Sequence, residues 1–484
     1  MAGYKNLFKQ TFIYGLATVL PRALSIILVP LYVSTLEKSD YGIYASLFAF
    51  IIFGNVLLSY GMETAFFRFI NRKDQEVKQV ESTALTSLTI TSVLFLLVTL
   101  PNVQWIAQVL DYKSEFIFYT TWILALDALV VIPFSWFRAR EKPMRYAVLR
   151  IANVAVNLGL NLFFFLLLPK LSMDSIFWRK IYYPDNLVIY VFLSNLIASA
   201  LTLIWVLPIY LKIGFRWNIH LWKQMLRYAM PVLLAGIAFS INEALDKILL
   251  KYLLPPDVAD AEVGVYAACY KLGVFMTLFS TAFRLGVEPF FFKQADSKQA
   301  TTVYATITKY FTLMGSIIFL FVMVYIDVFK LILIREESYW EAMDIVPIIL
   351  LANLFLGVYH NLSVWYKITD KTRVGAYISI AGALMTIVCN YLLIPYLSYY
   401  GSALATLIAY GTMMLLSYIL GQKYYPIPYP RNEIIIYLIV STAFSFVAFY
   451  IFEGSLILGT ILLIIYLGIL YIMEKNKILQ LIKR

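Results

Sequence analysis

The sequence GIYA at residues 42–45 opens a long apolar stretch, and a close copy, GVYA at residues 264–267, opens a second such stretch. Other short matches keep the same order along the two halves of the chain: FKQ at 8–10 with WKQ at 222–224, and TAF at 64–66 with TAF at 281–283. Because the order of these matches agrees, the sequence predicts two structurally related halves. The apolar stretches around the matches indicate the fold class.

Apolar residues dominate the composition. Of the 484 residues, 62% are hydrophobic and 14% are charged, against roughly half and a quarter in soluble proteins. A helix needs about 20 apolar residues to cross a hydrocarbon core about 30 Å thick. The sequence therefore predicts an all-α integral membrane protein with about fourteen transmembrane helices, near residues 11–32, 41–66, 83–100, 116–134, 147–168, 187–211, 228–250, 265–285, 311–333, 345–365, 376–397, 402–420, 434–452 and 456–473.

The predicted spans group into two pseudo-symmetric six-helix lobes and a C-terminal pair. Residues 1–221 hold the first lobe, residues 222–421 hold the second, and residues 422–484 hold the last two spans and a tail. Because six is an even number, both lobes start on the same side of the membrane, so the repeat is parallel. Two such lobes facing each other enclose a central cavity, as alternating-access transporters require. Transport is therefore the predicted activity.

The basic residues predict the topology. The chain carries 39 Lys and Arg against 28 Asp and Glu, a net charge of +11, but they are spread over short loops, so nucleic-acid binding is not expected. If the N-terminus is cytoplasmic, the outer loops hold few basic residues, namely Lys38, Lys113, Lys170, Arg179, Lys180, Lys251 and Arg335. The positive-inside rule thus predicts that both termini are cytoplasmic.

Two neighbouring stretches, NYLLIP at 390–395 and YGSALAT at 400–406, carry a family resemblance together with DYGIY at 40–44. They resemble the polysaccharide transporter family of the multidrug/oligosaccharidyl-lipid/polysaccharide flippase superfamily, and the resemblance extends over essentially the whole chain. It implies a V-shaped pair of lobes that flips an undecaprenyl-diphosphate-linked oligosaccharide, such as an O-antigen or capsule repeat unit, across a bacterial cytoplasmic (inner) membrane. Membrane lipids and a polysaccharide polymerase machinery are the implied partners. The chain departs from the family pattern in a longer outer loop at 169–186.

Charges inside the apolar spans are candidate binding residues, because a charge near the bilayer centre costs about 2.5 to 3.5 kcal/mol. Arg22 lies deep in the first predicted span. It either faces the cavity and binds a substrate pyrophosphate, or it pairs with Asp127 or Glu63. Lys271 in span eight either binds substrate or extends its ammonium group to the outer interface.

Three further arginines lie near the cytoplasmic ends of predicted spans. Arg68 and Arg284 either receive the diphosphate at the inner leaflet or anchor their helices, and Arg150 is interpreted as an anchor. Glu63 and Glu288 are close in sequence to Arg68 and Arg284. Local ion pairs are therefore expected for both acids.

Two acids in the spans are candidates for ion or proton coupling, Asp127 in span four and Asp246 in span seven. Near Asp246, the i, i+4 spacing of Glu243 and Lys247 predicts an ion pair on one helix face.

Asn153, Asn157 and Asn161 form a polar stripe on one face of span five. Asn157 is the candidate for hydrogen bonding to sugar, and interhelical contact is the alternative for the stripe.

Signals for an enzyme are weak. The only histidines are His220 and His360, and the only cysteines, Cys269 and Cys389, lie in apolar segments, so neither a metal site nor a disulfide framework is predicted. No Walker A sequence is present, and no cofactor is expected. A lipid-linked oligosaccharide flippase is the predicted function. A cation-coupled multidrug exporter of the same superfamily is one alternative, and a membrane-embedded glycan polymerase or ligase is the other.

Overall fold

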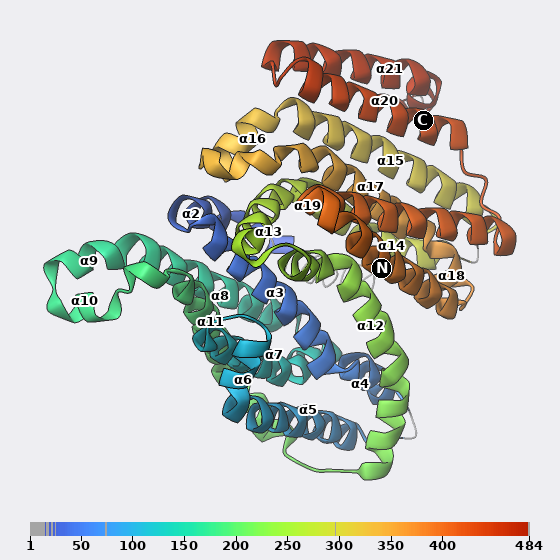
Figure 1. Cartoon of the computed structure of the whole chain (residues 1–484). Coiled ribbons are helices and arrows are strands. Elements are labelled where there is room, and N and C mark those ends of the chain that lie inside the picture. The colour runs from blue at the N-terminus through green and yellow to red at the C-terminus, as the bar shows by residue number, and fades with distance from the viewer. Residues whose placement is uncertain are drawn as a thin grey trace. The chain divides into compact units, whose positions relative to one another are not determined.

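The computed structural model describes residues 26–72, 75–295 and 297–482, with residues 15, 19, 20, 23 and 24 before them. These residues form helices and connecting turns, and no strand occurs among them. The chain divides into two compact units, Met1–Gly264 and Val265–Arg484 (Figure 1). Arg22 lies outside the described residues.

The first unit is built around the helix α7. Its helices are α2 (Leu28–Thr35), α3 (Lys38–Ser59), α4 (Met62–Ile70), α5 (Val77–Thr99), α6 (Val103–Val109), α7 (Ser114–Ala139), α8 (Pro143–Leu162), α9 (Leu168–Asp174), α10 (Ile176–Ile181), α11 (Val188–Ile213) and α12 (Ile219–Leu253). α7 packs against α3, α5 and α11, and α8 packs against α11. Ile132 and Phe137 of α7 lie in one buried cluster with Leu85 of α5 and Phe66 of α4, so α7 presents apolar side chains to several neighbours.

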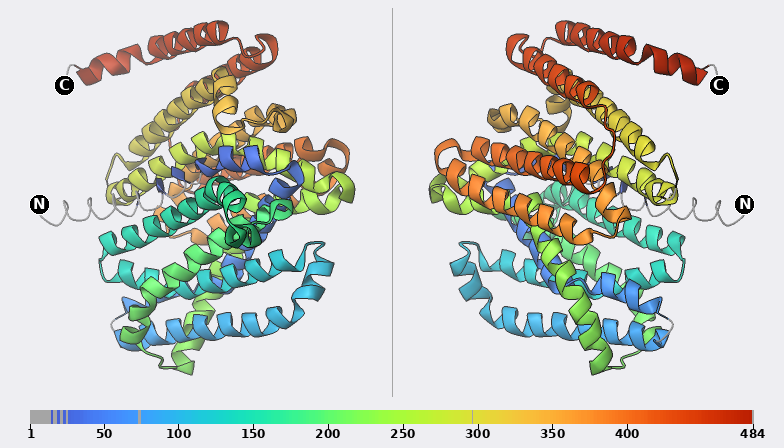
Figure 2. Two further views of the ribbon diagram at one scale, coloured as in Figure 1. Left: turned by 90° about the vertical axis from the view of Figure 1, so that its left-hand side faces the viewer. Right: turned by 90° about the vertical axis from the view of Figure 1, so that its right-hand side faces the viewer.

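The second unit is built around α17 (Val346–Leu362), which packs against helices on several sides. After α13 (Pro256–Tyr270), which crosses the division, its helices are α14 (Val274–Gln294), α15 (Ala300–Val324), α16 (Ile326–Leu333), α17, α18 (Val364–Ile368), α19 (Thr372–Tyr424), α20 (Arg431–Phe446) and α21 (Leu456–Ile482). Figure 2 shows α20 and α21, in red, alongside α15, in yellow.

A buried ionic cluster ties the last two helices to α15. Lys309 of α15 pairs with Glu433 of α20 and with Glu474 of α21. The Tyr437 hydroxyl donates a further hydrogen bond of 2.7 Å to Glu474. Because a buried charge is costly unless it is paired, this cluster favours one packing arrangement of α20 and α21 against α15.

The described residues include 11 helices that are long and apolar enough to cross a membrane. One of them, α19, is 53 residues long and contains a backbone break at Ser398, with φ 47° and ψ −132°, so it provides two helical arms. α12, with 35 residues, is also long enough to span. The predicted all-α fold with about fourteen spans is confirmed. The two symmetric lobes with a boundary at residues 221 and 222 stay a prediction. The two compact units of the structure meet at Gly264 and Val265.

The two glycines of the repeated tetrapeptide pack against each other. A Cβ added to Gly42 would lie 1.7 Å from the Asp260 carbonyl oxygen, and one added to Gly264 would lie 1.9 Å from the Lys38 carbonyl oxygen. Neither distance leaves room for a side chain. The glycines therefore allow α3 and the start of α13 to approach at backbone distance.

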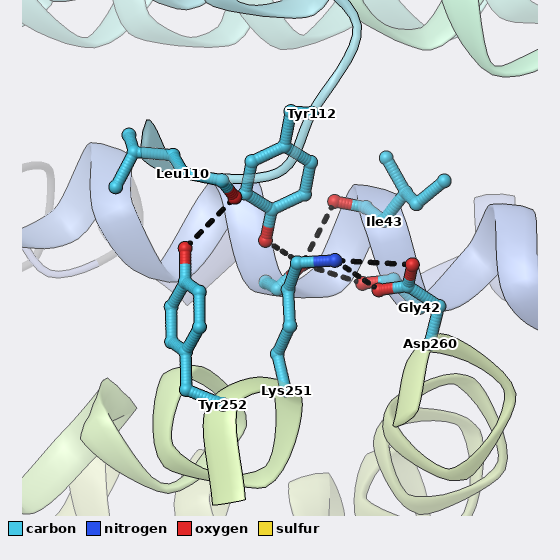
Figure 3. A network of polar contacts seen from close by, with 8 residues as sticks. Gly42, Ile43, Leu110, Tyr112, Lys251, Tyr252 and Asp260 are labelled. Carbon is cyan, nitrogen blue, oxygen red and sulfur yellow. Dashed lines mark hydrogen bonds and ion pairs between the residues drawn. The ribbon is translucent and has the colours of Figure 1, made fainter. Parts of the chain in front are cut away.

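A polar network closes around this crossing (Figure 3). The buried Lys251 ammonium lies 2.9 Å from Asp260 Oδ1 and 4.3 Å from the centre of the Tyr112 ring. The Tyr112 hydroxyl donates to Ser46 Oγ at 2.7 Å, and burial raises the pKa of Tyr112, so it stays a donor at neutral pH. Together these contacts connect α3, α12 and the start of α13 to the turn before α7.

Candidate functional site

A polar cavity of about 460 Å³ lies inside the first unit. Its walls come from α3, α4, α7, α8 and α11. The polar side chains that line it are Asn55, Ser59, Glu63, Asp127, Arg150, Asn153, Asn195, Ser199 and Thr202. In a chain with 62% hydrophobic residues, such a concentration of amides, hydroxyls and charges is suited to a hydrated, polar ligand.

Asp127 is the central acid of this cavity. Ser199 Oγ of α11 donates to Asp127 Oδ1 at 2.8 Å, and Asn55 Nδ2 of α3 donates to Oδ2 at 3.4 Å. Within the part of the chain that the structure describes, no basic side chain lies within ion-pair distance of this carboxylate. The predicted alternative, a pair between Arg22 and Asp127, falls on a residue outside that part.

Arg150, interpreted from the sequence as a helix anchor, also provides a basic side chain in this cavity. It lines the cavity, and its guanidinium lies 4.3 Å from the centre of the Phe134 ring and 5.7 Å from that of Tyr146. The sequence contained a signal for this position, because Arg150 precedes Asn153 by three residues and therefore shares its helix face.

The three asparagines of the stripe on α8 differ in their surroundings: one lines the cavity, and the others contact neighbouring side chains. Asn153 lines the cavity and donates to Thr202 Oγ1 of α11 at 2.9 Å. Asn161 accepts a hydrogen bond of 2.8 Å from the Tyr32 hydroxyl and donates to Asn157 Oδ1 at 3.2 Å. Asn157 is not among the residues that line the cavity, so its predicted role in sugar binding stays a prediction.

The expected local ion pair of Glu63 with Arg68 is wrong. Glu63 Oε1 lies 2.6 Å from Arg138 Nη1 of α7, while the Arg68 guanidinium lies 4.7 Å from the centre of the Tyr228 ring. The two residues are five positions apart, and helix partners on one face are three or four apart. Glu63 lines the cavity, and its ion pair with Arg138 connects α4 to α7.

The corresponding pair in the second unit, Glu288 with Arg284, is also wrong. Glu288 Oε1 lies 2.6 Å from Lys367 Nζ of α18, and Arg284 Nη1 lies 3.4 Å from His360 Nε2. An acid that follows its basic partner by four residues has the less favourable orientation on a helix. These four side chains surround a cavity of only about 20 Å³, which has room for about one water molecule.

Two further candidates from the sequence are Lys271 in the second unit and Asp246 in the first. Lys271 occupies a short 3₁₀ turn, Lys271–Gly273, between α13 and α14. Asp246 is buried, and its Oδ1 lies 3.0 Å from Lys247 Nζ. The predicted pair of Lys247 with Glu243 is therefore wrong, because Glu243 points to an exposed position whereas the buried Asp246 carboxylate requires a cation. Among the described residues, no group of three or more His, Cys, Asp or Glu could hold a metal ion.

The described helices form the fold of a multi-span membrane protein, with a polar cavity inside its first unit. Residues 7–279 match the family described as "Polysaccharide biosynthesis protein", and residues 231–392 match the MatE family. The first match covers more than half of the chain, so the chain belongs to the polysaccharide biosynthesis protein family. This confirms the family resemblance of the sequence.

Solved structures share the fold at low sequence identity. The lipid II flippase MurJ in an inward closed conformation matches with a TM-score of 0.69 and 14% identity, over 95% of this chain and 99% of that chain. An inward-facing multidrug resistance MATE family transporter matches with a TM-score of 0.63 and 15% identity, over 86% and 94%. A mutant of the Vibrio cholerae MATE transporter VcmN matches with a TM-score of 0.54 and 17% identity, over 87% and 96%. No curated protein matches the sequence.

Proposed function

We propose that this protein flips an undecaprenyl-diphosphate-linked oligosaccharide across the bacterial cytoplasmic membrane by alternating access, for surface polysaccharide biosynthesis. The family match over residues 7–279 carries the proposal, because it points to polysaccharide biosynthesis in particular. The likeness to the lipid II flippase is consistent with a lipid-linked substrate. In this proposal both termini are cytoplasmic, and a polysaccharide polymerase machinery uses the flipped product.

The chemistry of the polar cavity suits such a substrate. A diphosphate prefers charge-assisted hydrogen bonds from a planar guanidinium, which Arg150 offers on the cavity wall. Sugar hydroxyls both donate and accept, and Asn153, Asn195 and Thr202 offer matching groups. The other residues of the proposed path, predicted from the sequence, are Arg22, Arg68, Asn157, Lys271 and Arg284 for the substrate and Asp127 and Asp246 for coupling.

A cation-coupled multidrug exporter is the second candidate. The observation that favours it is Asp127, a carboxylate in the cavity whose partners are a hydroxyl and an amide. Such an acid is suited to binding a proton or a small cation, and MATE transporters are among the structural neighbours.

Reconstitution in liposomes separates the two candidates. A fluorescent undecaprenyl-diphosphate oligosaccharide is placed in both leaflets, and its accessibility in the outer leaflet is followed with and without the protein. In parallel, liposomes loaded with a cationic dye report export under an imposed ion gradient. The proposal expects flipping of the lipid and no dye export. Dye export by folded protein that does not flip a matched glycolipid would favour the exporter.

A further inference from the structure

A short helical hairpin exposes an apolar tip. It consists of α9 and α10, which pack against each other beyond the end of α8 (Figure 1). Met173, Ile176 and Phe177 at its tip have relative exposures of 77%, 74% and 63%. Three neighbouring large apolar side chains exposed to this degree are unfavourable in water. A partner of apolar character is therefore expected to cover them.

The hairpin is held in place by specific contacts. The Tyr190 hydroxyl of α11 donates to the Ile181 carbonyl at 2.7 Å and accepts from the Tyr183 amide at 2.7 Å. Arg179 Nε donates to the Ser172 carbonyl at 3.4 Å, across the hairpin. These contacts fix both the end of α10 and its position beside α9, so the apolar tip is presented by an ordered element.

The hairpin continues a membrane span. α8, the π-helical turn Phe163–Leu167 and α9 form one helical run, Pro143–Asp174, of 32 residues. Leu162, Leu166 and Leu167 are exposed along this run and face the surroundings of the helix bundle. Because a span needs about 20 residues to cross the hydrocarbon core, the last residues of the run lie at the level of the lipid headgroups. The hairpin tip therefore continues the surface that faces lipid.

Charged and aromatic residues surround the tip in the pattern of a membrane interface. Lys170, Arg179 and Lys180 are exposed beside the apolar side chains, and the acids of the segment are Asp174 and Asp185. Basic groups of this kind interact with lipid phosphates. Trp178 lies against Phe163, with ring centres 5.8 Å apart, and indole rings favour the headgroup level.

We propose that α9 and α10 form an interfacial anchor that binds the phospholipid surface. Met173, Ile176 and Phe177 insert at the boundary of headgroups and acyl chains, and Lys170 and Lys180 contact lipid phosphates. The anchor sets the depth of α8 in the bilayer, and α8 also carries Arg150 and Asn153 of the polar cavity. The proposal requires neither the proposed substrate nor a particular orientation of the chain.

The test places an environment-sensitive dye on the tip. Phe177→Cys, in a Cys269→Ala and Cys389→Ala background, is labelled with a nitrobenzoxadiazole dye, and the protein is placed in nanodiscs of phosphatidylcholine with or without phosphatidylglycerol. Asp185→Cys, labelled in the same way, is the matched control at an exposed position after the hairpin. We expect blue-shifted emission at position 177 and quenching by lipids with a headgroup-proximal spin label that exceeds quenching at position 185 by about twofold.

The basic residues supply the second arm of the test. Lys170→Gln with Lys180→Gln is expected to lower the quenching at position 177 in nanodiscs that contain phosphatidylglycerol, with little change in phosphatidylcholine alone. Water-like emission at position 177 that spin-labelled lipids do not quench would overturn the proposal. Emission that shifts only with the number of protein copies per nanodisc would also overturn it, in favour of a second copy of this chain as the occupant.

Discussion

At the scale of single residues, Asp127 and Arg150 both line the polar cavity and do not form an ion pair with each other. Asp127 accepts hydrogen bonds from Ser199 and Asn55, while Arg150 stacks on Phe134. A direct pair of the two would neutralise both charges and leave neither for a ligand. The observed arrangement instead leaves the guanidinium available for an anion and the carboxylate available for a proton or a cation.

The first prediction concerns Asp127. Asp127→Asn keeps a carbonyl oxygen for Ser199 and removes the negative charge, so a coupling role predicts that flipping loses its acceleration by an imposed proton or sodium gradient. The rate under the gradient is expected to fall by about tenfold, which corresponds to about 1.4 kcal/mol. The rate is measured in liposomes, and the exposed Glu115→Gln serves as the control. A variant that still responds fully to the gradient would show that Asp127 is not the coupling residue.

At the scale of elements, the sequence predicted the helices well and their ends less well. Apolar length indicated each span, because a helix that crosses a bilayer must be long and apolar. The turn at Ser398 and the hairpin of α9 and α10 were not predicted, since a backbone break and a short interfacial helix have no simple hydropathy signal. The repeated tetrapeptide was recognised from the sequence. Only the structure shows that its two glycines, Gly42 and Gly264, contact each other.

This contact gives the second prediction. Gly42→Ala places a methyl group 1.7 Å from a backbone oxygen, so α3 must move away from α13, at a cost of about 1 to 3 kcal/mol. Gly159→Ala is the control, because nothing lies within 4 Å of its added Cβ and alanine favours a helix over glycine by about 1 kcal/mol. Thermal unfolding in detergent is expected to show a lower midpoint for Gly42→Ala only. Equal midpoints for both variants would mean that the close contact is unimportant for stability.

At the scale of the whole molecule, the fold class and the family could be predicted from the sequence, whereas the candidate site could be predicted only in part. Composition and repeated motifs report the environment and the ancestry of the chain. Ion pairs between helices depend on how the helices pack, so Glu63 with Arg138 and Glu288 with Lys367 were missed. The position of Arg150 on the cavity wall was missed for the same reason, because its distance from a predicted span end does not reveal which side of the helix faces the cavity.

The most direct measurement of the central claim is the flipping rate of Arg150→Gln in liposomes with fluorescent undecaprenyl-diphosphate oligosaccharide. Arg145→Gln, an exposed position near the start of the same helix, is the matched control. If the cavity binds the diphosphate through Arg150, the lost charge-assisted hydrogen bonds, about 1.5 to 3 kcal/mol, slow flipping roughly 10- to 100-fold in Arg150→Gln and leave Arg145→Gln close to wild type. Equal flipping by Arg150→Gln, Arg145→Gln and the wild type would contradict the account.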